Sequence, residues 1–152
     1  MSEFELQLRN WYQGEIAGAA FFDALADGAQ SDDEAGKWSL LGRLESTMAQ
    51  RLSEACAAAS IALPDLSSDS GYVEYARKMA GKPWRSNMEF LMPQLRRVVP
   101  EIRAAARRAP AAYADIAGEF LAHEEALAAF VSAELSGEDG SPAVWSLLRQ
   151  WS

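Results

Sequence analysis

Hydrophobic residues recur at helical spacing along most of the chain, and no stretch shows the strict alternation that is typical of a β-strand. Over residues 3–26 the apolar positions lie three, four or seven residues apart, which places them on one face of an α-helix. Gly28 follows this segment and predicts its end. The apolar face of this first helix comprises Phe4, Leu8, Tyr12, Ala19 and Phe22.

A second helix is predicted from residue 31 to about residue 60. Ser31 and Glu34 have the S-x-x-E spacing of a capping box, a pattern that opens helices. The connection from the first helix is short, so the two helices are expected to be antiparallel neighbours. Cys56 lies in an alanine-rich stretch and is expected to be a small core residue. The inward-facing positions are Trp38, Leu41, Leu44, Met48, Leu52 and Ala55.

The connection that follows, residues 61–83, is too long for a hairpin loop. It contains Pro64, a Ser/Asp-rich turn and a short amphipathic piece at residues 72–79. A connection of this length predicts a crossover along the bundle. A third helix is expected over residues 87–107, where Pro93 and Pro100 should kink or split it.

Pro110 suits the first position of a fourth helix, which is predicted to end near residue 135. These elements predict an all-α, antiparallel four-helix bundle with a long crossover between its second and third helices. Residues 1–152 have the size of a single domain, and 49% of them are hydrophobic, enough for a sizeable core. The tail at residues 141–152 is expected to pack as a short amphipathic segment on the bundle or on a partner subunit.

The charge of the chain bears on its partners. Its net charge is −8, and Lys and Arg cluster only on the third predicted helix, so we expect no binding to nucleic acid. No apolar run reaches about 18 residues, which predicts no membrane span. The N-terminus has no signal-peptide pattern, so a cytoplasmic location is expected.

Two glutamates occur within the apolar faces instead of opposite them. Glu15 has the phase of the first helix's apolar stripe, and Glu45 has that of the second. With the turn near residues 28–30, antiparallel pairing puts the two carboxylates at the same level. Buried carboxylates are rare unless they are paired or bind metal. Facing carboxylates repel each other, so one takes up a proton unless a cation lies between them.

The fourth predicted helix contributes His123 and Glu124, which straddle its apolar stripe. The order of these residues resembles the ferritin-like superfamily of the rubrerythrin and bacterioferritin type. That family places Glu on the first helix, E-x-x-H on the second, Glu on the third and E-x-x-H on the fourth, and binds two irons. The matching positions here are Glu15, residues 45–48 (E-S-T-M), Glu89 and residues 120–123 (F-L-A-H).

The resemblance implies a ferritin-like fold, iron or manganese as the metal, and a core site built from the matching side chains. Two positions depart from the family's pattern. Met48 replaces the expected His, and a thioether is a poor ligand for iron. Phe120 replaces the expected Glu and cannot bind metal. The remaining donors favour a single metal, a rearranged site or a lost one, and Glu119 or Glu124 is a candidate for the missing carboxylate.

Structural explanations compete at each position. Glu15 and Glu45 are also explained as a buried pair satisfied by neighbouring groups, and His123 as a core histidine that bonds a Glu. Glu89 forms an S-x-x-E capping box with Ser86, which is a sufficient structural reason for it.

Three hypotheses follow from the sequence. The first is a ferritin-like protein with a carboxylate-based iron or manganese site, or the metal-free remnant of one, with Tyr12 as a donor to Glu15. Its chemistry would be redox with dioxygen or peroxide. The second is a non-catalytic bundle that binds a partner or self-associates as a homodimer through Trp145 or Trp151. The third is a relative of the tRNA hydroxylases, which share the bundle, although the acidic net charge opposes it.

Overall fold

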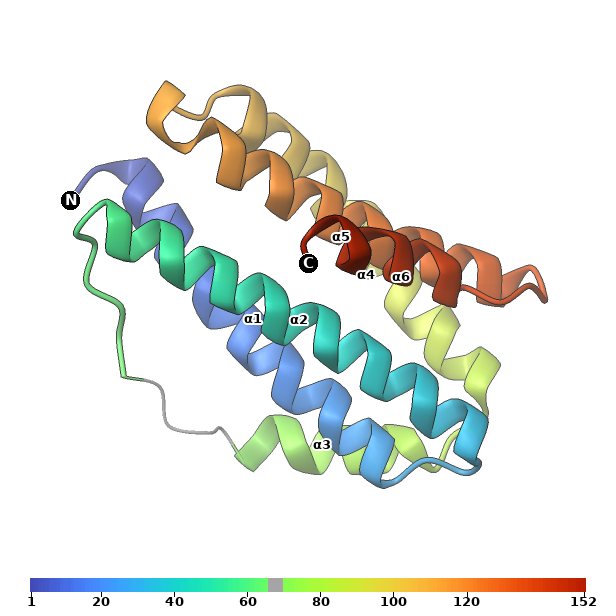
Figure 1. The fold of residues 1–152 in the computed structure, drawn as a ribbon. Helices are drawn as coiled ribbons and strands as arrows, with labels where there is room; N and C mark the ends of the chain where they lie inside the picture. Colours follow the sequence, from blue (N-terminus) through green and yellow to red (C-terminus); the bar gives the residue numbers. More distant parts are fainter. Residues whose placement is uncertain (66–69) are drawn as a thin grey trace.

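The computed structural model describes residues 1–65 and 70–152, and it is helical throughout (Figure 1). No β-strand occurs in these two segments, so the predicted all-α class is confirmed. The helices are α1 (Glu3–Asp27), α2 (Asp32–Ala58), α3 (Ser70–Ala80), α4 (Trp84–Arg107), the 3₁₀ turn η1 (Ala111–Tyr113), α5 (Ala114–Leu135) and α6 (Ser141–Gln150).

The long helices are arranged as two hairpins (Figure 1). α1 packs along α2 and α4 packs along α5, while α3 lies against α1 and α6 contacts both α5 and α2. The predicted connection at 61–83 includes residues 66–69, which lie outside the described residues. Its later part contains α3, in agreement with the amphipathic pattern at residues 72–79.

Side-chain caps fix where the first two helices begin. The hydroxyl of Ser31 accepts from the backbone N–H of Glu34 at 3.1 Å, as the S-x-x-E spacing predicts. The same spacing at Ser2 and Glu5 forms a complete capping box, in which each side chain accepts from the other residue's backbone N–H. Gly28 caps the end of α1, as predicted. These bonds satisfy N–H groups that a first helical turn leaves without helical partners.

Helix α4 is continuous from Trp84 to Arg107, with Pro93 and Pro100 inside it. Of the two predicted effects, a kink or a split, the split is therefore wrong. Both prolines are exposed, and their separation of seven residues places them on one face. The carbonyl groups that lose their helical partners thus lie near solvent, where water can hydrate them.

The start of α4 also differs from the prediction. Pro83 is the N-cap and Trp84 begins the helix, so the expected start at residue 87 is wrong. Ser86 lies inside the first turn, and the predicted capping box with Glu89 does not form. Asn87 is buried instead, and its side-chain amide donates to the carbonyl of Met79 at 2.8 Å, which ties α4 to α3.

Pro110 precedes the 3₁₀ turn η1, and α5 begins at Ala114, so Pro110 is not the first residue of the fourth long helix. A proline has no N–H to donate and its φ is fixed, which suits a tight turn as well as a helix start. The hydroxyl of Tyr113 donates to the Glu5 carboxylate at 3.0 Å, so this turn is tied to the beginning of α1.

Two clusters of buried apolar side chains fill the interior. The cluster near the α1–α2 turn includes Trp38 and Phe130, and the cluster at the opposite end includes Leu8 and Met48. Cys56 is buried in the second cluster, which confirms that it is a core residue. Burial of these side chains provides the main driving force for docking the two hairpins.

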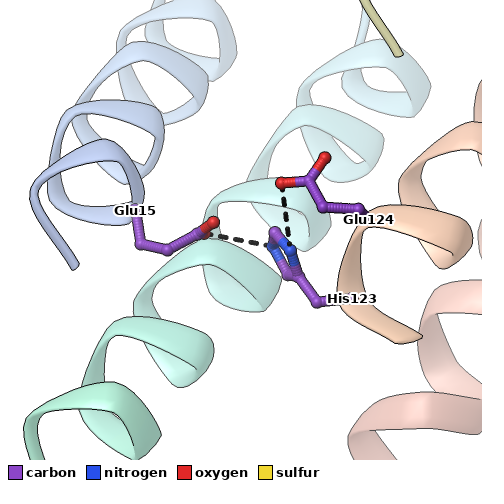
Figure 2. A group of neighbouring side chains, drawn as sticks. All are labelled: Glu15, His123 and Glu124. Carbon is purple, nitrogen blue, oxygen red and sulfur yellow. Dashed lines mark ion pairs between the residues drawn. The ribbon is translucent and has the colours of Figure 1, made fainter. Parts of the chain in front are cut away.

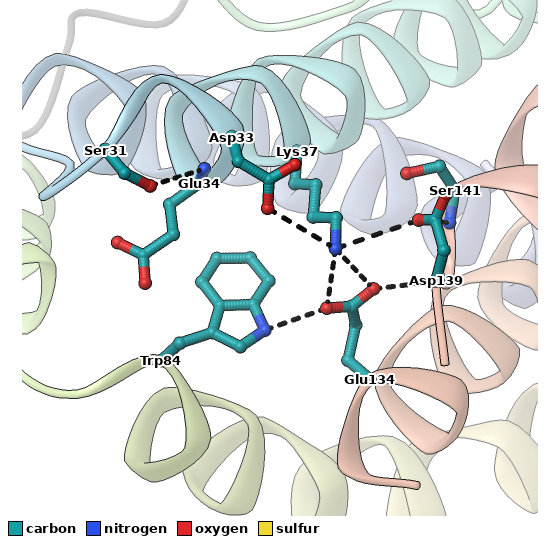
Figure 3. A network of polar contacts seen from close by, with 9 residues as sticks. Ser31, Asp33, Glu34, Lys37, Trp84, Glu134, Asp139 and Ser141 are labelled. Carbon is teal, nitrogen blue, oxygen red and sulfur yellow. Dashed lines mark hydrogen bonds and ion pairs between the residues drawn. The ribbon is translucent and has the colours of Figure 1, made fainter. Parts of the chain in front are cut away.

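A polar network at the edge of the first cluster joins three helices (Figure 3). The ammonium of Lys37 lies 2.9 Å from both oxygens of the Glu134 carboxylate. The indole N–H of Trp84 and the backbone N–H of Gly140 donate to the same carboxylate at 3.0 and 2.7 Å. Burial acts to lower the pKa of Lys37, but the hydrogen bond to Glu134 and the charge of Glu134 raise the Lys37 pKa above its ordinary value. The network thus connects α2, α4 and α5.

The tail forms α6, which buries Val144, Leu147 and Leu148. The tail packs against α5 and α2. Trp145 is 39% exposed, and the guanidinium of Arg43 lies over its ring, 5.3 Å from the centroid. Among the described helices, none has both the length and the apolar character required to cross a membrane.

Candidate metal centre

Four polar side chains meet in the middle of the molecule, between the two apolar clusters. Glu15 comes from α1, Glu45 from α2, and His123 and Glu124 from α5; Figure 2 shows three of them. Glu15, Glu45 and His123 are only 3%, 7% and 0% exposed. The structure thus brings together four of the predicted ligand candidates, and Glu89 and Glu119 lie elsewhere.

Glu15 and Glu45 reach the same ring nitrogen of His123. Its Nε2 lies 2.6 Å from Oε2 of Glu45 and 3.1 Å from Oε2 of Glu15. At the other edge of the ring, Nδ1 lies 3.4 Å from Oε1 of Glu124. The prediction that antiparallel pairing puts Glu15 and Glu45 at one level is therefore confirmed. Ligand atoms of Glu15, His123 and Glu124 all lie within 4.8 Å of one another, close enough to surround one metal ion.

Two atoms of this cluster are buried without a hydrogen-bond partner. Nε2 carries at most one hydrogen, and the hydrogen bond to Glu45 uses it. Oε2 of Glu15 is consequently left without a donor. Nδ1 of His123 also has none, because its contact with Glu124 does not meet hydrogen-bond geometry. Leaving a buried polar atom unpaired costs about 1–3 kcal/mol, so such atoms mark places where an ion or water binds.

The electrostatics of the cluster favour a positive charge at its centre. Burial acts to lower the pKa of His123, yet attraction to Glu45, its hydrogen bond with Glu45 and the nearby carboxylate of Glu124 raise it to about 10. Burial raises the pKa of Glu45, and the charge of His123 offsets part of this effect. Without metal, a proton is thus held between His123 and Glu45 at neutral pH. A divalent cation would compensate more of the negative charge than this proton does.

Neighbouring residues set the positions of these groups. A Cβ at Gly18 would lie 2.7 Å from Oε1 of Glu45, so a glycine at this position lets that carboxylate approach α1. The ring of Phe120 stacks on the imidazole of His123, with 5.6 Å between centroids, and Trp11 stacks on Phe120 at 4.3 Å. At the position where the ferritin-like pattern has a carboxylate, Phe120 therefore orients the imidazole and offers no ligand.

Other predicted residues lie outside the cluster. The carboxylate of Glu89 is 58% exposed and pairs with Arg85 at 3.0 Å, so the structure does not bring Glu89 to the centre. Glu119 forms a two-point pair with Arg51 at 2.6 and 2.9 Å. Tyr12 packs against the second apolar cluster, and among the described contacts it donates no hydrogen bond to Glu15.

The donor set fits a divalent metal. Carboxylates together with one imidazole suit Mn²⁺ and Fe²⁺, and thiolates or several imidazoles are not required. Two ligands bound at right angles, each about 2.1 Å from one metal, lie about 3 Å apart. The 3.1 Å between Oε2 of Glu15 and Nε2 of His123 matches this spacing. The 2.6 Å to Glu45 is shorter, as a hydrogen bond requires, so that carboxylate would move back slightly on binding metal.

Comparison of the chain with protein-family models, with curated proteins and with solved structures finds no match in any of the three.

Proposed function

We propose that this chain binds one iron or manganese ion between the carboxylates of Glu15 and Glu45 and Nε2 of His123. The observation that carries the proposal is the convergence of two buried carboxylates on one imidazole nitrogen, with one carboxylate oxygen left unpartnered. A bound cation would give all three groups a common partner and relieve the repulsion between the carboxylates.

Glu124 also has a ligand atom within 4.8 Å of those of Glu15 and His123, but in this proposal it holds the imidazole in place, because it faces Nδ1 and not Nε2. A histidine that binds metal through one ring nitrogen usually donates its other N–H to a carboxylate or carbonyl, which fixes its tautomer. Nδ1 of His123 faces Glu124 at 3.4 Å, so a small movement would complete that hydrogen bond. The hydrogen bond from Nδ1 to Glu124 would become better aligned once the ring proton resides on Nδ1.

Iron or manganese in this position would supply redox chemistry with dioxygen or peroxide, as the resemblance to ferritin-like proteins implies. The chain itself holds the ligands and keeps a proton at Nδ1 of His123, and the two apolar clusters border the centre on its two sides. Met48 and Phe120 replace two of the family's ligands, which limits the site to a single metal.

The proposal includes the fold, a ferritin-like four-helix bundle of α1, α2, α4 and α5 with a crossover between α2 and α4. Its support is the pairing of these helices into two hairpins and the position of α3 against α1, within the connection. The order of Glu15, Glu45 and His123 along the helices supports it as well. We place this protein in the cytoplasm as part of the same proposal.

Metal analysis of protein purified without chelators tests the site. We expect about one iron or manganese per chain, and loss of that metal in Glu15→Gln and Glu45→Gln. Glu124→Gln should weaken the affinity by about 10–100-fold, as expected for a residue that orients a ligand. Glu89→Gln is the matched control, because its carboxylate is exposed and distant from the centre. Equal metal content in all four variants would refute the proposal.

One observation favours a second function, a non-catalytic bundle. Because the pKa of His123 is raised to about 10, a protonated imidazole can offset the buried carboxylates without metal. The cluster would then be a structural network, and the bundle would act by self-association or partner binding. This alternative predicts metal-free protein and a homodimer that Trp145→Ser converts to monomer in sedimentation analysis. A monomer with stoichiometric metal would exclude it.

A further inference from the structure

Two clefts adjoin the candidate metal centre. One has a volume of about 410 Å³ and the other about 590 Å³. Both are lined by Gly14, Glu45, Val98 and Glu124, so they form one groove with carboxylates at its midpoint. Pockets of roughly 300–1,000 Å³ are the size that holds small organic ligands.

The packing of the helices explains the groove. α1 packs on α2 and α4 packs on α5, but no extensive packing between α1 and α4 exists among the described helices. Gly14, in the middle of α1, faces this gap, and a Cβ at its position would meet no atom within 4 Å. Packing therefore does not require glycine there, although glycine weakens a helix. Any larger side chain at this position would stand in the groove.

The two parts of the groove differ in chemistry. The smaller part is polar at its rim, where Gln7, Asn10, Glu101 and Arg108 line it. The larger part is lined mainly by apolar side chains, among them Phe21, Phe22, Leu91, Leu127 and Val131, together with the exposed Arg97. An apolar cleft that ends at a polar centre fits a molecule with an apolar body and one polar end.

The charge of the centre determines whether the polar end of the ligand can be anionic or must be neutral. Three carboxylates outweigh the two positive charges of a divalent metal, so the loaded centre remains negative. An anionic end would be repelled, whereas a neutral oxygen could still bind the metal. Three protein ligands leave further coordination positions, and the carboxylates that hold the metal line the groove.

Building on the proposed metal centre, we infer that the groove binds a small neutral organic molecule with an apolar chain. The chain would lie in the larger cleft between α1 and α4, and a hydroxyl or carbonyl oxygen at its end would reach the metal. This assigns a substrate class to the centre: medium-chain alcohols, aldehydes or ketones.

Calorimetric titration of the manganese-loaded protein with 1-decanol, decanoate and decylamine tests this class. We expect 1-decanol to bind, and decanoate to bind at least about tenfold more weakly because of its charge. In metal-free protein, decanol should lose about tenfold in affinity because its oxygen has no metal to bind. If decylamine binds metal-free protein more tightly than decanol binds the loaded protein, the cluster is an ammonium site, and the inference is wrong.

Two glycine variants locate the binding site. Gly14→Phe should fill the groove without a backbone clash and reduce decanol affinity by at least about tenfold, while manganese is retained. Gly36→Phe is the matched control, because Gly36 is also helical, also meets no atom within 4 Å, and does not line the groove. Equal decanol binding by both variants would overturn the inference.

A spectroscopic measurement separates the two proposals. Cobalt substituted for manganese should show a change in its visible absorption when decanol is added, because a new oxygen ligand alters the metal's geometry. If metal binds but decanol neither binds nor changes the cobalt spectrum, this inference fails and the metal centre stands. If no metal binds, the proposed function fails, and the assignment of the oxygen to a metal fails with it.

Discussion

His123 and Glu45 are joined by a contact of 2.6 Å between Nε2 and Oε2, and both side chains are buried. The two residues belong to different hairpins, α5 and α2, and lie 78 positions apart in the sequence. A short, charge-assisted hydrogen bond is among the stronger polar interactions in proteins. The bond thus ties the two hairpins together at the position where apolar packing is interrupted.

Replacing His123 with leucine should strongly destabilise the metal-free protein. Glu15 and Glu45 would then face each other in the interior without a positive partner, and breaking a buried pair in this way costs about 3–5 kcal/mol. Urea unfolding followed by circular dichroism measures the change. Glu89→Gln should alter stability by no more than about 0.5 kcal/mol. A loss below about 1 kcal/mol for His123→Leu would mean that the cluster contributes little to stability.

The stability of the metal-free protein should fall as the pH rises from about 6.5 to about 10. The pKa of His123 is about 10 in the folded chain, against an ordinary value of 6.5. A group whose pKa is higher in the folded chain than in the unfolded chain stabilises the folded state. This stabilisation is complete below the unfolded pKa and is lost as the pH rises through the folded pKa. The loss should be on the order of a few kcal/mol. Thermal unfolding across this range measures it.

Two comparisons test whether the pH dependence of stability comes from His123. His123→Leu should remove the part that the imidazole contributes, and the remaining dependence comes from Glu45, whose pKa burial raises. Manganese-loaded protein should also show a flatter profile, because a bound metal requires the neutral imidazole and replaces the proton. If the wild-type and His123→Leu proteins lose stability in parallel between these pH values, another group is responsible.

Alanine should raise stability at one of the two glycines that flank Glu15 and weaken manganese binding at the other. Gly14→Ala adds a methyl group to open space in a helix interior and should stabilise the fold by about 0.5–1 kcal/mol. Gly18→Ala places a Cβ 2.7 Å from Oε1 of Glu45, so it should displace that carboxylate and weaken manganese binding. Urea unfolding and metal titration of both variants test this. Unchanged manganese affinity in Gly18→Ala would show that Glu45 does not hold the metal.

Glu134→Gln should destabilise the end of the molecule near the α1–α2 turn by about 1–3 kcal/mol. The Glu134 carboxylate is 6% exposed and accepts from Lys37, Trp84 and the backbone of Gly140 (Figure 3). A neutral amide leaves the partly buried ammonium without its main counter-charge. Asp139→Asn is the control, because that carboxylate is 60% exposed, and its effect should stay within about 0.5 kcal/mol. Equal effects of the two substitutions would contradict the assigned role.

The sequence predicts the helices well because their signals are local. Apolar periodicity, the cap at Ser31 and the stop at Gly28 each depend on residues within about one turn, and the structure confirms them. Pro93 and Pro100 do not divide α4 because they and the residues whose carbonyl groups lose a partner, Glu89 and Arg96, are exposed, so water can hydrate those groups. Solvent exposure depends on the tertiary structure, so the local sequence does not predict it.

The candidate site is predictable in part, again because some of its signals are local in the sequence. Glu15 and Glu45 stand out because a charge falls in an apolar phase, and hairpin geometry brings them level. Glu89 was included through the order of a family pattern, which does not account for the rotation of α4 that turns this side chain to solvent. The role of Gly18 depends on contact with another helix, so the sequence shows the glycine without showing what approaches it.

The proposed ligands of the centre are divided between the two hairpins, and this division has a consequence for folding. Glu15 and Glu45 come from the first hairpin and His123 from the second, so neither hairpin alone offers the complete set. The centre can form only late, after contacts distant in sequence have been made. Once occupied, it would slow the separation of the hairpins, so metal content would govern the lifetime of the native state as well as its chemistry.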